Sequence, residues 1–154
     1  MKVILPGSYD PITLGHLEII KRAAKEFDEV FVTVFINPDK EYMFSTGDRV
    51  KMIALATEDI PNVTVDSSDG YVVDYMREHG IDKIIKGYRN EVDLEYERRQ
   101  AKFNLERGGY ETELWLCEDA FSEISSTKAR RLIEEDGNLS ALLPEKVISF
   151  VRKH

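Results

Sequence analysis

A short stretch near the start of the chain carries side chains that could hold a phosphate group. Ser8, Thr13 and His16 lie within the run PGSYDPITLGH, which follows the apolar run Val3–Leu5 and precedes residues with helical spacing. This pattern predicts a turn from a buried strand into a helix, where backbone amides are unpaired and favour an anion. A histidine there could donate to a bound phosphate, or it could be hydrogen-bonded only within the protein.

Three cationic side chains are predicted to follow other strands of the chain. Lys40, Lys86 and Arg89 could bind the phosphates of an anionic substrate. The alternatives are that both lysines are solvated surface residues and that Arg89 pairs with Glu91 or Asp93 at a helix start. A position directly after a strand favours the functional interpretation of each.

Hydroxyl residues open a late helix. Ser125, Ser126 and Thr127 could serve only as an N-terminal cap, with Ser125 or Ser126 as the capping residue. Hydroxyls and free amides at a helix start also suit phosphates, and the apolar Phe121 and Ile124 before them could face adenine. Both interpretations can hold together.

One predicted helix has a polar face. Asp93, Glu97, Gln100 and Asn104 recur at helical spacing, which is typical of a face in contact with solvent.

The elements that must position these residues alternate along the chain. The predicted strands are Val3–Leu5, Val30–Ile36, Val63–Val65, Lys83–Lys86 and Glu113–Leu116. The predicted helices are 15–27, 45–57 with Ser45 as its cap, 71–79, 91–107, 125–135 and one from Pro144 to the C-terminus.

Strand and helix alternation predicts an α/β fold in a single domain over residues 1–154. We expect a Rossmann-like, doubly wound, five-stranded parallel sheet with helices on both faces. Ligands then bind beyond the carboxyl ends of the strands, so the five loops that follow the strands should meet at one site. The P-loop and G-x-G-x-x-G fingerprints are absent from the sequence, so phosphates must be held in another way.

Composition excludes several classes of protein. The net charge of −8 argues against a duplex nucleic-acid partner, because that surface is normally basic. Cys117 is the single cysteine and cannot form an internal disulfide, and no signal segment or membrane span is evident. We expect a cytoplasmic protein.

Motifs along nearly the whole chain resemble one enzyme family. The pair formed by T-x-G-H at 13–16 and Ser-Ser-Thr at 125–127 is similar to the signature of the nucleotidyltransferase superfamily. The ordered set resembles the bacterial phosphopantetheine adenylyltransferases. The matching segments are 6–16, Lys40 with 43–45, 48–50, 70–75, 86–89, 93–97, Asn104, 124–126 and 143–144.

The resemblance implies adenylyl transfer from ATP to 4′-phosphopantetheine, which gives dephospho-coenzyme A and pyrophosphate without a covalent enzyme intermediate. It implies that His16, Lys40 and Arg89 are catalytic, with His16 stabilising the transition state at the α-phosphate. It also implies Mg²⁺, bound mainly through the ATP phosphates, and a homohexamer.

The resemblance further assigns residues to the two substrates. The implied ATP-binding residues are Ser8, Tyr9, His16, Gly87, Tyr88, Arg89, Glu97, Phe121, Ile124, Ser125, Ser126 and Thr127. The implied acceptor-binding residues are Ser8, Lys40, Val72, Lys86 and Asn104.

Some positions depart from the pattern of this family. Lys86 stands where arginine is usual, Tyr71 and Tyr88 where leucine is common, and Ser8 where threonine is frequent. These departures leave two alternatives: a nucleotidyltransferase acting on nicotinamide mononucleotide or an alcohol phosphate, and a non-catalytic nucleotide-binding module.

Overall fold

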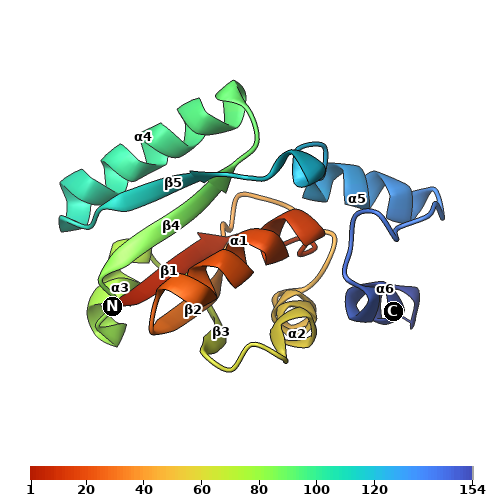
Figure 1. The fold of residues 1–154 in the computed structure, drawn as a ribbon, viewed down its shortest axis with the longest axis horizontal. Helices are drawn as coiled ribbons and strands as arrows, with labels where there is room; N and C mark the ends of the chain where they lie inside the picture. Colours follow the sequence, from red (N-terminus) through yellow and green to blue (C-terminus); the bar gives the residue numbers. More distant parts are fainter. Residues whose placement is uncertain (154) are drawn as a thin grey trace.

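The computed structural model of the chain describes residues 1–153 and has the predicted α/β architecture (Figure 1). Five strands alternate with helices. The elements are β1 (Lys2–Gly7), α1 (Leu14–Glu26), β2 (Glu29–Phe35), α2 (Thr46–Thr57), β3 (Val63–Ser68), α3 (Val72–His79), β4 (Lys83–Tyr88), α4 (Glu91–Gly108), β5 (Thr112–Leu116), the 3₁₀ helix η1 (Asp119–Phe121), α5 (Ser126–Glu134) and α6 (Glu145–Lys153).

The strands form one sheet in the order β3-β2-β1-β4-β5, and every neighbouring pair is parallel. Strands β2 and β3 are added in turn on one side of β1, and the chain then crosses to place β4 and β5 on the other side. This reversal between β1 and β4 is the topological switch point where α/β sheets bind ligands. The predicted doubly wound parallel sheet is confirmed.

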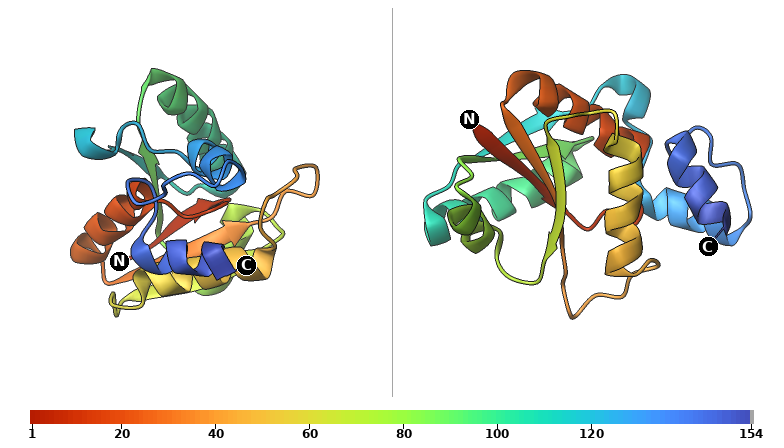
Figure 2. Two further views of the ribbon diagram at one scale, coloured as in Figure 1. Left: turned by 90° about the vertical axis from the view of Figure 1, so that its right-hand side faces the viewer. Right: turned by 90° about the horizontal axis from the view of Figure 1, so that it is seen from below.

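Two apolar clusters cover the two faces of the sheet. On β1, Val3 and Leu5 belong to the larger cluster, whereas Ile4 belongs to the smaller one. The larger cluster includes residues of α1, α2, α5 and α6, and the smaller one includes residues of α3. Figure 2 shows α6 lying against α2, beside the sheet. Alternate strand residues therefore bury opposite faces, which fixes the register of each strand.

Three strands extend beyond their predicted ends. β1 includes Pro6 and Gly7, which pair with Thr33 and Val34 of β2. β3 continues to Ser68 and β4 to Tyr88, since their polar or small residues pair through backbone groups with a neighbouring strand. The predicted fourth strand, Lys83–Lys86, is therefore too short by two residues. Backbone pairing across the sheet outweighs the local signal of glycine and serine.

Most predicted helix boundaries are confirmed. Ser45 accepts a hydrogen bond from the Asp48 amide, and Ser125, not Ser126, caps α5 by accepting from the Lys128 amide. Gly80 and Gly109 end α3 and α4 in the left-handed conformation that glycine tolerates best. The helix η1 was not predicted. Within residues 1–153, every helix is too short or too polar to cross a membrane.

Close packing of α3 against α4 predicts that Gly108→Ala destabilises the protein. A Cβ atom at Gly108 would lie 2.7 Å from the Cβ atom of Val73. Overpacking of this kind costs about 1–3 kcal/mol of the free energy of unfolding. Urea unfolding followed by circular dichroism should give a lower midpoint than for the wild type.

Gly47 provides the matched control because a Cβ atom there meets nothing within 4 Å. Gly47→Ala, within α2, should leave the free energy of unfolding unchanged or raise it by about 0.5–1 kcal/mol. Equal midpoints for the two alanine variants would contradict the packing account.

Candidate active site

The loops that follow the strands enclose one cavity at the carboxyl edge of the sheet, with a volume of about 890 Å³. All the predicted site residues line it; their individual roles stay predictions. They are Ser8, Tyr9, His16, Lys40, Val72, Lys86, Gly87, Tyr88, Arg89, Glu97, Asn104, Phe121, Ile124, Ser125, Ser126 and Thr127. The switch point between β1 and β4 therefore brings together residues that are far apart in the sequence.

The turn between β1 and α1 begins at Ser8 and ends at the helix cap Thr13. Thr13 is 2% exposed, and its hydroxyl accepts a hydrogen bond from the His16 amide. This hydroxyl is used to start α1, although the sequence had suggested it as a ligand donor. Tyr9 adopts a left-handed conformation at φ 49°, and its hydroxyl donates to the Leu5 carbonyl at 2.8 Å. The Tyr9 ring also packs edge-on against His16.

His16 completes a reciprocal pair of hydrogen bonds at the start of α1. The backbone N–H of Thr13 donates to His16 Nδ1 at 3.0 Å, so Nδ1 acts as an acceptor. The neutral ring then carries its proton on Nε2. Burial, assisted by the charges of Lys86 and Arg89, lowers the pKa of His16 to about 4. The histidine is therefore an uncharged hydrogen-bond donor near neutral pH.

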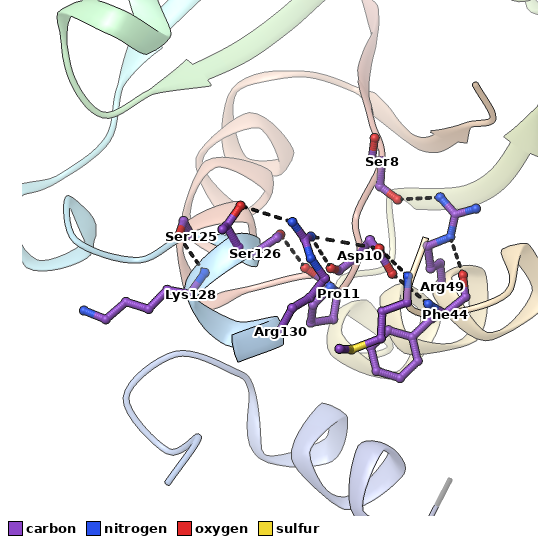
Figure 3. Close-up of polar contacts among 11 residues, drawn as sticks. Ser8, Asp10, Pro11, Phe44, Arg49, Ser125, Ser126, Lys128 and Arg130 are labelled. Atoms are coloured by element: carbon purple, nitrogen blue, oxygen red, sulfur yellow. Dashed lines mark hydrogen bonds and ion pairs between the residues drawn. The ribbon is translucent and has the colours of Figure 1, made fainter. Parts of the chain in front are cut away.

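Asp10 connects this turn to the loop that follows β2 and to helix α5 (Figure 3). Asp10 is 3% exposed and accepts hydrogen bonds from the backbone amides of Met43 and Phe44, at 2.8 and 2.9 Å. From α5, Arg130 donates to the Asp10 carbonyl at 2.7 Å and lies 3.9 Å from the carboxylate. The buried carboxylate of Asp10 thus fixes the segment that follows β2, and the Asp10 carbonyl anchors α5 through Arg130.

Arg49 supports the same turn through a hydrogen bond to its backbone. It is 1% exposed and donates through Nε to the Phe44 carbonyl at 3.1 Å and through a terminal nitrogen to the Ser8 carbonyl at 3.0 Å (Figure 3). A third hydrogen bond goes to the Thr46 hydroxyl. The buried cation of Arg49 therefore binds the backbone of Ser8, a residue predicted to contact both substrates.

The start of α5 is joined to the turn through Ser126. Its hydroxyl donates to the Pro11 carbonyl at 2.8 Å, and the Ser125 hydroxyl caps the helix (Figure 3). The Thr127 hydroxyl accepts from Arg130 at 3.1 Å. The capping interpretation is confirmed for Ser125 alone, and Ser125, Ser126 and Thr127 all line the cavity.

Lys86 is held beside a buried carboxylate. Its ammonium group donates to the Pro6 carbonyl at 2.9 Å and lies 3.5 Å from Glu97 Oε2. Glu97 is 7% exposed, and among the described residues no hydrogen bond reaches Oε2. Burial raises the pKa of Glu97, and the charge of Lys86 opposes that shift. The interpretation of this helix face as solvent-exposed is wrong for Glu97 and for Asn104, which is also buried.

Arg89 forms the predicted pair with Asp93. Its Nε lies 2.9 Å from the Asp93 carboxylate, which also accepts from the Arg89 backbone amide. The guanidinium group still lines the cavity, so the ion pair orients it there. The structural and functional interpretations hold together at this position.

Sequence reasoning missed the residues that support the site. Asp10, Arg49 and Arg130 act through partners that are 33 to 120 residues away in the chain. One signal was available, since Arg49 shares a helical face with the buried Met52 and Ile53. An arginine on a buried face indicates a specific set of acceptors.

The lowered pKa of His16 predicts a pH-dependent stability. An unfolded chain takes up a proton on this ring below pH 6.5, its ordinary pKa, whereas the folded ring resists protonation down to about pH 4. The contribution of the neutral His16 ring to the free energy of unfolding is therefore complete above pH 6.5 and decreases as the pH falls toward 4.

His16→Gln should remove this part of the acid destabilisation. The measurement is the urea midpoint of both proteins between pH 7 and pH 4, with an NMR titration of the wild-type ring. A His16 ring that titrates near pH 6.5 would contradict the assignment.

Comparisons with known proteins place the chain in a family. The cytidylyltransferase-like family matches residues 4–132. A phosphopantetheine adenylyltransferase of Clostridium novyi is 46% identical over 96% of this chain and 92% of its own length. Relatives with the same name from Corynebacterium efficiens and Corynebacterium glutamicum are each 41% identical, over 99% and 98% of this chain and 97% and 95% of their own. The chain belongs to the cytidylyltransferase-like family of nucleotidyltransferases and, within it, to the phosphopantetheine adenylyltransferases.

Proposed function

We propose that this protein transfers the adenylyl group of ATP to 4′-phosphopantetheine, releasing pyrophosphate and dephospho-coenzyme A in coenzyme A biosynthesis. The observation that carries the proposal is the cavity at the switch point, where an uncharged histidine donor lies among Lys40, Lys86 and Arg89. Relatives that share nearly the full chain are phosphopantetheine adenylyltransferases.

The reaction is a direct displacement at the α-phosphorus. A phosphate oxygen of the acceptor forms a new P–O bond while the bond to the pyrophosphate oxygen breaks, so no side chain becomes covalently modified. Catalysis then consists of placing two anions in line and stabilising the charge on the α-phosphate. The Nε2–H group of His16 suits this stabilisation because it is a donor whose position is fixed by the helix cap.

The acceptor phosphate is proposed to lie near Ser8, Lys40 and Lys86. Lys86 has one donor directed to the Pro6 carbonyl and is close to Glu97, which leaves its ammonium group able to meet an anion. Val72 and Asn104 line the same cavity and are assigned to the pantetheine arm.

The nucleotide is proposed to occupy the opposite side of the cavity. Arg89 and the first turn of α5 would bind the phosphates, where helix amides favour an anion. Phe121 and Ile124 would contact adenine, together with Gly87 and Tyr88. The remaining residues assigned to ATP are Ser8, Tyr9 and Glu97.

Magnesium is proposed to reach the site with ATP. Among residues 1–153 there is no group of three or more histidine, cysteine, aspartate or glutamate side chains suited to hold a metal, and the Asp10 carboxylate already accepts two amides. Mg²⁺ commonly keeps several waters and binds through substrate phosphates, which fits this donor set. The ion would neutralise charge on the triphosphate.

We further expect a homohexamer in the cytoplasm. Two apolar side chains of α4 that lie outside the cavity are exposed, Phe103 at 46% and Leu105 at 50%, which supports association of subunits through this helix. The lone Cys117 is a free, buried thiol, as suits a reducing compartment.

Magnesium-dependent pyrophosphate release tests the proposed function. ATP or CTP is combined in turn with 4′-phosphopantetheine, nicotinamide mononucleotide and glycerol phosphate. Release only with ATP and 4′-phosphopantetheine is expected. Release with another acceptor would identify a different nucleotidyltransferase, and no release with any pair would favour the nucleotide-binding module.

His16→Ala should lower kcat about 100- to 1000-fold, because one preorganised donor to the transition state is lost. Pyrophosphate release under saturating substrates measures the effect. Thermal unfolding and ATP binding should show that the variant is folded.

His79→Ala is the matched control. His79 stacks on Tyr75 on the other face of the sheet and does not line the cavity. It should retain wild-type turnover. Wild-type turnover in the His16 variant would refute its role.

A further inference from the structure

The ring of Tyr42 lies close to two cations at the proposed acceptor end of the cavity. Its ring centroid is 3.8 Å from the guanidinium carbon of Arg49 and 5.5 Å from the ammonium nitrogen of Lys40. Both distances are within the range of an attractive cation–π contact. Tyr42 itself is half-buried and lines the cavity.

The ring of Tyr42 is held in place from several directions. Its hydroxyl accepts a hydrogen bond from the Asn37 amide at 3.0 Å, which closes the loop that follows β2. The next two residues, Met43 and Phe44, are bound through their amides to Asp10. Arg49 is buried and fixed by three further acceptors, so it forms a rigid support for the ring.

Lys40, in contrast, lies on the exposed part of this loop. Among the described residues its ammonium group forms no ion pair, and its backbone amide is bound in the turn to the Asn37 carbonyl. A lysine side chain free to rotate would lose conformational entropy on binding a phosphate. The Tyr42 ring is a partner that can limit this freedom before the substrate arrives.

We propose that Tyr42 is a positioning residue that holds the Lys40 ammonium group toward the phosphate of the acceptor. It acts through Lys40 and does not itself need to touch the reacting atoms. The inference rests on the proposed function, which places the acceptor phosphate at Lys40. Tyr42 should therefore affect the acceptor and leave ATP binding unchanged.

Calorimetric binding and steady-state kinetics of Tyr42→Leu and Tyr42→Phe test the proposal. The leucine variant loses the aromatic face, so Kd and KM for 4′-phosphopantetheine should rise about two- to fivefold, as expected for an exposed cation–π contact. The phenylalanine variant keeps the ring and should stay within about twofold of the wild type. The Kd and KM for ATP should be unchanged in both variants.

A double-mutant cycle with Lys40→Ala separates positioning from a general effect on folding. If Tyr42 acts through Lys40, adding Tyr42→Leu to Lys40→Ala should weaken acceptor binding no further. Tyr110→Leu, a half-buried tyrosine outside the cavity, is the matched control and should leave acceptor binding unchanged.

An unchanged acceptor Kd in Tyr42→Leu, an equal rise in the ATP Kd of that variant, or additive effects in the double variant would each overturn the proposal. Equal losses in the leucine and phenylalanine variants would also overturn it, because the hydroxyl and not the ring would then be responsible. A wild-type protein that binds the acceptor but releases no pyrophosphate would instead refute the proposed function, since the binding cycle does not depend on turnover.

Discussion

The buried carboxylate of Asp10 is the interaction on which the site depends. It accepts the amides of Met43 and Phe44 and lies beside Arg130, so it joins the turn after β1, the loop after β2 and helix α5. Parallel strands bring such loops to one edge of the sheet but do not fix their distances. A charged acceptor with two amide donors is a strong, directional link. The proposed acceptor and triphosphate regions are therefore held relative to one another by the carboxylate and the backbone carbonyl of Asp10, together with the hydrogen bond from Ser126 to the Pro11 carbonyl.

Electrostatics explains how a chain of net charge −8 can receive two anionic substrates. Lys86 is paired with Glu97 of α4, and Arg89 is paired with Asp93 of the same helix. These two ion pairs set the positions of the cations at the cavity. Arg49 adds a buried positive charge behind the Ser8 carbonyl. Between these charges His16 remains neutral, since burial and the nearby cations both disfavour its protonated form. A neutral donor can meet a phosphate oxygen without first requiring a proton from solvent.

Local patterns were sufficient to predict the alternation of strands and helices along the chain, the parallel sheet and several caps. Ser45 and Gly80 act through neighbours within a few residues, so their roles follow from propensity alone. The extensions of β1 and β4 and the buried state of Glu97 were not predictable in this way, because they depend on strands and side chains that meet only in the folded protein. The motif around His16 indicated the site, but not that Thr13 would fix the ring by a reciprocal hydrogen bond.

Direct transfer within one cavity is the central claim of this account, and the stereochemistry at the α-phosphorus tests it most directly. The measurement uses ATP that carries sulfur at the α-phosphate in a single configuration, with 4′-phosphopantetheine as the acceptor. One in-line displacement predicts that the product has the inverted configuration at phosphorus. Retention of configuration would require two displacements through a covalent enzyme intermediate, and it would contradict the role given to His16 and the cations around it.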